Sequence, residues 1–188
     1  MTKIKGYTCS CCGKYHEELL TSYGNPAPVY YYDAAPEERE DRFELDDDLC
    51  VMNNEHFFIR GYIEIPIIGT DEHLIWGVWV SLSEANFNNI KEHWDKQELL
   101  EPMFGWLSTD LPCYPDTVNL KTMVHPRPNG IRPFIELEPT DNPLSVELRD
   151  GVTTERVQEI AAQLVLITIT KKKSIESPSM LFLLERLS

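Results

Sequence analysis

Residues 57–81 read FFIRGYIEIPIIGTDEHLIWGVWVS, and the pattern of this stretch predicts two strands joined by a turn. Bulky apolar side chains recur at every second position in both halves, which is the period of a strand with one buried face. The letters GTDE at 69–72 are typical of a turn between the halves. We therefore expect an antiparallel hairpin of two strands, over 57–68 and 74–82.

This hairpin carries apolar bulk on both faces, since Ile75 and Trp79 oppose a face that includes Trp76 and Val78. A two-stranded ribbon alone is marginal in water, because it cannot bury its apolar side chains. Further strands and helices of the same chain must therefore cover both faces.

A second pair of strands is predicted over 118–125 and 131–138, joined by the letters PRPNG, whose NG dipeptide is a strong hairpin turn signal. Apolar side chains at helical spacing predict a helix over about 82–94, with Ser81 and Glu84 as a capping box. The clearest apolar stripe follows a threonine cap at 153 and predicts a second helix, which residues 165–170 either prolong or leave as a strand.

The elements together predict a single α+β domain over residues 1–165, with an antiparallel sheet of at least four strands covered by two or three helices. A small N-terminal Cys/His knuckle in the segment 7–50 would pack on this domain, and 166–188 would form a C-terminal extension. Three other segments are interpreted as an extended aromatic loop (17–35), a short helix (36–45) and an ordered, buried loop (100–117).

Charge limits the partners of this 188-residue chain, because 17 basic and 31 acidic residues give a net charge of -14 at pH 7. Such a charge argues against binding nucleic acid or an anionic membrane and favours a basic protein partner. The first dozen residues lack the apolar core of a signal peptide, and no run approaches the ~20 apolar residues that span a bilayer. We therefore expect a cytoplasmic protein. Its oligomeric state does not follow from the sequence.

The N-terminal letters YTCSCCGKYH contain a possible zinc site. Cys9 and Cys12 are spaced as CxxC, His16 lies within reach of the same ion, and Cys50 is another thiol that folding could bring near. Two sulfurs, one imidazole and a third sulfur make a chemically complete tetrahedral set for structural Zn²⁺. Two alternatives stay open, namely reduced cysteines that are only packed and a redox CxxC, for which the expected βαβ context is absent.

Two functions fit these features. The first is a small binding or regulatory domain with a structural zinc knuckle and an acidic surface for a basic partner. The second is a hydrolase-like enzyme, and its cleft would be lined by five residues: Trp76, Trp79, Trp106, Arg60 and Arg132. Whether the protein is an enzyme stays open, because no nucleophile elbow, phosphate loop or dinucleotide fingerprint is present.

A further set of polar residues lies on the second predicted hairpin, where His125, Arg127, Arg132, Glu136 and Glu138 are close in sequence. Opposite charges that pair across a hairpin are commonplace, so we interpret these residues as exposed salt bridges. No catalytic residue is assigned from the sequence.

Several long blocks of the sequence resemble the bacterial family catalogued as domain of unknown function 2199, over about residues 7–164. The blocks are CSCCGKYH (9–16), DLCVMNNEHFFIRGYIEIPI (48–67), WGVWVSLSE (76–84), GWLSTDLPCYPDT (105–117) and GIRPFIELEPTDNPLSVE (130–147). The resemblance implies that Cys9, Cys12 and His16 form a unit with Gly13, and that Cys11 is incidental. It implies no activity, and the tail after Val165 leaves the family pattern.

Overall fold

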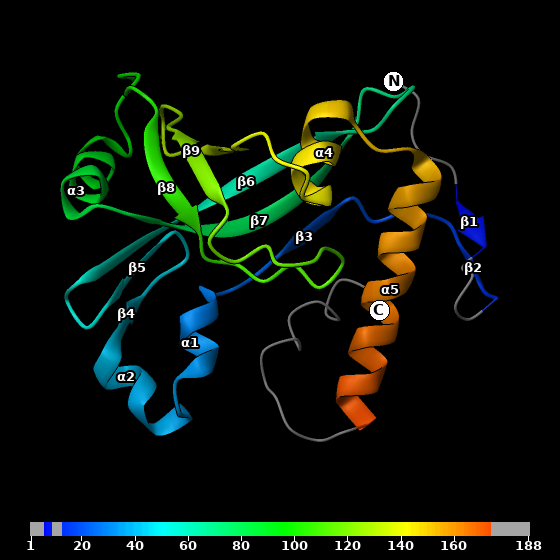
Figure 1. The fold of residues 1–188 in the computed structure, drawn as a ribbon, viewed down its shortest axis with the longest axis horizontal. Helices are drawn as coiled ribbons and strands as arrows, with labels where there is room; N and C mark the ends of the chain where they lie inside the picture. The colour runs from blue at the N-terminus through cyan, green and yellow to red at the C-terminus, as the bar shows by residue number, and fades with distance from the viewer. Residues whose placement is uncertain (1–5, 9–12, 174–188) are drawn as a thin grey trace.

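The computed structural model describes residues 6–8 and 13–173, and Figure 1 shows their arrangement. Its elements are β1 (Tyr7–Thr8), β2 (Tyr15–His16), β3 (Ser22–Gly24), α1 (Val29–Asp33), the 3-10 helix η1 (Pro36–Glu38), α2 (Arg39–Arg42), β4 (Phe43–Leu45), β5 (Leu49–Met52), β6 (His56–Pro66), β7 (His73–Leu82), α3 (Glu84–His93), β8 (Met103–Leu107), β9 (Lys121–His125), β10 (Phe134–Leu137), α4 (Pro143–Asp150) and α5 (Thr154–Lys173). The fold is mixed α+β, as the sequence predicts.

The central sheet closes into a five-stranded barrel in the order β6-β7-β8-β9-β10, with β10 returning to β6. Both predicted hairpins are confirmed as antiparallel, with Ile63 opposite Trp76 in β6–β7 and Ile135 opposite Val124 in β9–β10. The barrel closes through a parallel contact between β10 and β6. Strand β3 adds to β7 in parallel, and the β4–β5 hairpin adds to β6, so three strands extend beyond the barrel.

The interpretation of 100–117 as a loop is wrong for five residues, because β8 occupies Met103–Leu107 and links β7 to β9. Within β8, burial alternates with exposure, since Gly105 is inside the barrel and Phe104 and Trp106 face outward. Prolines lie before and after this strand but not within it, so they do not break its pairing with β7 and β9.

The N-terminal third also differs from prediction. Instead of one extended loop, residues 17–35 contain the strand β3 and the short helix α1, and the predicted helix over 36–45 ends after η1 and α2, where β4 begins. The segment around 143–150 forms α4, a helix that the sequence pattern does not predict. Near α3 the cap is Ser83, whose side chain accepts a hydrogen bond from the N–H of Asn86, in place of the predicted capping box.

The core fills the barrel and continues under its helices, with α3 on the left of Figure 1 and α4 and α5 on the right. Its largest side chain is Trp76, which is 2% exposed. The helix predicted after 153 is confirmed as α5, and residues 165–170 prolong it. In the part of the chain that the structure describes, no helix is long and apolar enough to cross a membrane.

A second, smaller apolar cluster lies on the opposite face of β6 and β7, as the bulk on both faces of the hairpin predicts. Phe58 and Trp79 meet Cys50 of β5 and Phe43 of β4 there, and Ala34 at the end of α1 closes the cluster. The β4–β5 hairpin is therefore held against the barrel by packing as well as by strand pairing.

Candidate functional site

The outer face of β6, β7 and β3 forms the floor of a cleft. Gly77 of β7 lies opposite Gly24 of β3, and a Cβ added to Gly24 would lie 3.0 Å from Nη2 of Arg60. The Arg60 side chain begins on β6, opposite Trp79 of β7, and its Nη2 reaches the outer face of β3, where Gly24 has no side chain to block it. The absence of a side chain at Gly24 therefore leaves room for this guanidinium over β3.

The turn between β4 and β5 supplies the second wall of the cleft. The carboxylate of Asp46 accepts hydrogen bonds from the N–H groups of Asp48 (2.8 Å) and Leu49 (2.6 Å), a local pattern that fixes such turns. The backbone of the turn is also tied to β6, because the N–H of Arg60 donates to the carbonyl of Asp48 at 2.8 Å. These hydrogen bonds hold the β4–β5 turn against β6.

Arg132 lies beside Arg60, and both guanidinium groups donate to the carbonyl oxygen of Asp47 at 3.3 Å. Arg132 also donates from Nε to the Asp48 carboxylate and from Nη1 to the Tyr62 hydroxyl at 2.8 Å. One carbonyl of the β4–β5 turn therefore holds two positive charges at one end of the cleft.

The two arginines differ in their electrostatic surroundings. Burial and then the charge of Arg132 lower the pKa of Arg60, and nearby Asp48 offsets this only in part. Burial also lowers the pKa of Arg132, but its hydrogen bonds to Asp48 and Tyr62 outweigh that effect, so its pKa is raised. Arg60 makes no ion pair with any described residue, and its Nε is buried without a hydrogen-bond partner. Its positive charge is therefore poorly compensated.

The cleft has a volume of about 570 Å³. This falls within the range of roughly 300–1,000 Å³ that is usual for small-molecule sites. Its lining consists of Leu19, Leu20, Thr21, Ser22, Tyr23, Gly24, Pro26, Asp47, Arg60, Tyr62, Gly77 and Arg132. Apolar side chains, hydroxyl groups and one cationic corner thus surround a space that is large enough for a ligand.

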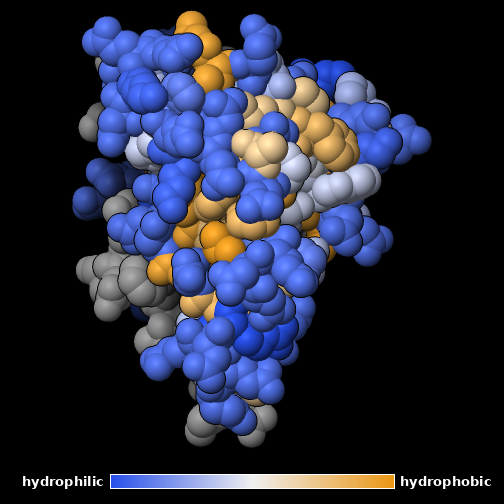
Figure 2. Space-filling model, turned by 90° about the vertical axis from the view of Figure 1, so that its left-hand side faces the viewer, coloured by the Kyte–Doolittle hydropathy of each residue, from blue (hydrophilic) through white to orange (hydrophobic). Residues whose placement is uncertain are grey.

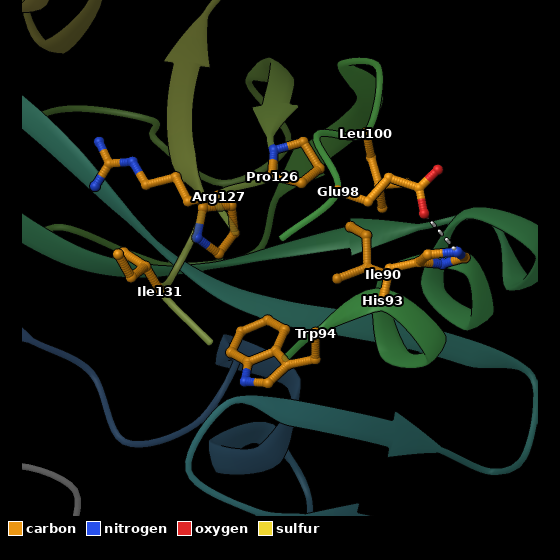
Figure 3. A pocket seen from close by; sticks show the side chains of 9 residues that line it. Ile90, His93, Trp94, Glu98, Leu100, Pro126, Arg127 and Ile131 are labelled. Carbon is orange, nitrogen blue, oxygen red and sulfur yellow. Dashed lines mark ion pairs between the residues drawn. The ribbon is translucent and has the colours of Figure 1, made fainter. Parts of the chain in front are cut away.

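A second pocket, between the end of α3 and the segments around 98–100 and 126–133, is too small to bind a ligand (Figure 3). Its volume is about 10 Å³, which accommodates about one water molecule. Its polar groups are already paired, because His93 lies 3.6 Å from Glu98 and Arg127 bonds Glu64 at 2.7 Å. In Figure 3 the guanidinium of Arg127 points away from His93 and Glu98.

The residues of the predicted Trp/Arg cleft are only partly brought together. Arg60 and Arg132 meet as described, but Trp76 and Trp79 are buried in two apolar clusters on opposite faces of the sheet. Trp106 is 41% exposed on the outside of β8 and does not line the cleft. The sequence suggested that the two arginines line a cleft. It gave no indication that Gly24 and Gly77 form its floor or that β3 contributes a hydroxyl group from Ser22.

Three of the five polar residues predicted to form salt bridges on the second hairpin pair across its strands, whereas Arg127 pairs with Glu64 of β6. His125 Nε2 lies 2.7 Å from the Glu136 carboxylate, and Lys121 pairs with Glu138 at 3.2 Å. Arg132 is not part of this group, since it turns to Asp48.

Two of the four predicted zinc ligands lie in described parts of the chain. Cys9 and Cys12 lie outside the described residues, and His16 ends the short strand β2. Cys50 is fully buried among aromatic side chains on β5, and burial raises the pKa of its thiol to about 12. Figure 1 shows β5 and the β1–β2 hairpin on opposite sides of the molecule. Within 6–8 and 13–173, no group of three or more His, Cys, Asp or Glu side chains could hold a metal ion.

The fold and its cleft define a small α+β domain built on a five-stranded barrel with a cationic corner. The model of the family DUF2199, described as "Uncharacterized protein conserved in bacteria", matches residues 8–152, and the chain belongs to this family. The match confirms the resemblance seen in the sequence and includes the barrel, the cleft and α4. Comparisons with curated proteins and with solved structures gave no match.

Proposed function

We propose that this protein is a binding domain whose cleft holds an anionic group, a carboxylate or a phosphate, against Arg60 and Arg132. The observation that carries the proposal is the Arg60 guanidinium, which is half-buried, lacks an ion pair with any described residue and faces a space of about 570 Å³. A partly buried charge without a counter-ion is unfavourable, and an anionic ligand would supply a charge-assisted hydrogen bond to Nη2 of Arg60, since Nη1 donates to Asp47 and Nε is buried.

Binding is favoured over the hydrolase alternative by the chemistry of the lining. The described lining has hydroxyl groups and the Asp47 side chain, but it contains no histidine, cysteine or glutamate. A hydrolase usually needs a positioned base next to its nucleophile or its water molecule. The groups around the cleft are better suited to holding a ligand than to moving its protons.

Small anions should test this proposal directly. With 10 mM succinate or phosphate and a Kd near 1 mM, binding to the native state should add about 1.4 kcal/mol of stability, or roughly 3–5 °C in Tm. Arg60→Gln should abolish this rise, measured against sodium chloride at equal ionic strength. Arg149→Gln serves as the matched control, because Arg149 is exposed and, among the described residues, forms its ion pair with Asp150. An equal rise in the Arg60→Gln protein would contradict the proposed site.

A basic partner is a second candidate function, supported by a segment that we call the acidic wing, residues 37–47. Its exposed carboxylates belong to Glu37, Glu38, Glu40, Asp41, Glu44, Asp46 and Asp47. Figure 2 shows hydrophilic residues covering the lower part of the molecule on the side of the β4–β5 hairpin. Such a surface attracts a basic protein at low ionic strength and loses this attraction as salt screens it.

We also propose that the N-terminal CxxC unit binds structural zinc. Protein purified without chelator should contain about one equivalent of zinc per chain by elemental analysis, because Cys9, Cys12 and His16 supply three of the four ligands of a closed site. Replacing Cys9 and Cys12 with serine should remove the zinc and lower the Tm. The control Cys11→Ser should change neither, and Cys50→Ala should leave the zinc content unchanged, because Cys50 lies in an apolar cluster. Metal-free wild-type protein would end this proposal.

A further inference from the structure

The cleft lies along an open edge of the sheet. β3 is at one end of the strand order and pairs only with β7 among the described strands. On the β7 side, the carbonyl of Thr21 accepts from the N–H of Ile75 at 2.7 Å, and the N–H of Asn25 donates to Gly77 at 3.1 Å.

Successive residues of a strand direct their backbone groups to opposite sides. Since Thr21 and Asn25 face β7, the N–H and C=O groups of Ser22 and Gly24 point to the open edge. No strand in the described part of the chain pairs with these groups. Both residues also line the cleft, so the edge and the cationic corner belong to one site.

This edge lacks the usual protection against a partner strand. Natural edge strands are commonly shielded by charged side chains, prolines or bulges. The other edge strand, β4, carries Glu44 and follows the charged α2, whereas residues 19–26 read LLTSYGNP and carry no charge. The only proline of this run, Pro26, comes after β3.

We propose that the occupant of the cleft is an extended peptide that pairs with the open edge of β3 and places an acidic side chain on Arg60. The inference rests on the proposed anion site and names its ligand. An added strand would lie about 4.8 Å from β3, and its alternate side chains would project over the face that holds Gly24 and the guanidinium. Main-chain hydrogen bonds would then give affinity, and the carboxylate would give specificity.

A peptide satisfies more of the site than a small acid does. A free carboxylate or phosphate compensates Arg60 but leaves the backbone groups of Ser22 and Gly24 without a partner. A peptide strand with one Asp or Glu side chain would compensate the charge of Arg60 and also pair with the backbone groups of Ser22 and Gly24. It also places apolar side chains near Leu19, Leu20 and Pro26, which line the same cleft.

The test compares two peptides with blocked, uncharged termini: acetyl-Thr-Val-Glu-Val-Thr-amide and the same peptide with Gln in place of Glu. Their binding to the full chain is measured by calorimetric titration. The Glu peptide should bind at least tenfold more tightly than the Gln peptide and more tightly than succinate. N-methylation of its alternate amides should reduce binding at least tenfold, because it removes edge hydrogen bonds without changing charge.

Two protein variants test the edge and the anion site. Ser22→Pro removes an N–H that points to the open edge, a position where sheets tolerate proline, so it should lose the peptide. Arg60→Gln should lose both the peptide and succinate, and thermal unfolding without ligand would show whether either variant remains folded. Succinate binding without peptide binding, or peptide binding that survives N-methylation, would overturn the inference while the anion site stands. If neither succinate nor the peptide bound, both proposals would be overturned.

Discussion

Trp76→Ala should lower the free energy of unfolding by about 3–5 kcal/mol, the usual cost of deleting a fully buried large aromatic side chain. Trp76 is 2% exposed and packs against Tyr23 and Tyr114, with ring centroids at 5.2 and 6.0 Å. These contacts join β7 to β3 and to the segment before β9. Alanine would therefore leave a cavity where three parts of the chain meet.

Urea unfolding of the two proteins measures this effect. Trp106→Ala is the matched control, because Trp106 is 41% exposed on the outside of β8. This substitution should lower the free energy of unfolding by less than about 1 kcal/mol. A loss below about 1 kcal/mol for Trp76→Ala would contradict its burial in the core.

Gly105→Ala should cost about 3 kcal/mol, at the upper end of the usual range for overpacking. A Cβ on Gly105 would lie 2.5 Å from Cγ1 of Val80 and 2.6 Å from the carbonyl oxygen of Ser81. The second contact is with backbone, which cannot turn aside as a flexible side chain can. The added methyl group would push β8 away from β7, next to the point where Ser81 pairs with Trp106.

Chemical denaturation again gives the measurement, and the neighbouring Phe104→Ala gives the control. Phe104 is 46% exposed on the same strand, so its truncation should cost less than the addition of one methyl group at Gly105. The reverse order would show that β8 does not approach β7 as closely as described.

The hairpins could be predicted from sequence because their signals are local. Alternation in β6 and β7 and the NG turn between β9 and β10 each involve neighbours in the chain, and the observed registers agree with them. The helix α5 was predictable for the same reason, since its apolar stripe is continuous.

Closure of the barrel could not be predicted in this way. Closure depends on β8, a short strand in a proline-rich segment that favours a loop prediction. It also depends on the pairing of Phe134 with Tyr62, which are distant in sequence. Local patterns do not report such pairings, and short strands take their conformation from their neighbours.

The candidate site was predictable only in part. Arg60 and Arg132 were suggested as cleft residues, but the tryptophans grouped with them are either core residues or lie elsewhere on the surface. The missing signal is the pair Gly24 and Gly77, because the effect of an absent side chain appears only when the strands that carry it are placed side by side.

The parallel contact that closes the barrel also sets an order for folding during synthesis. The β6–β7 hairpin is synthesised after β3, β4 and β5, and its barrel-facing side stays uncovered until β8, β9 and finally β10 have been synthesised. Domains generally fold as units once their last essential strand is available, and exposed apolar hairpins aggregate before then. A nascent chain that stops before Phe134 therefore presents an open sheet to the cell, and chaperones would recognise it as unfinished.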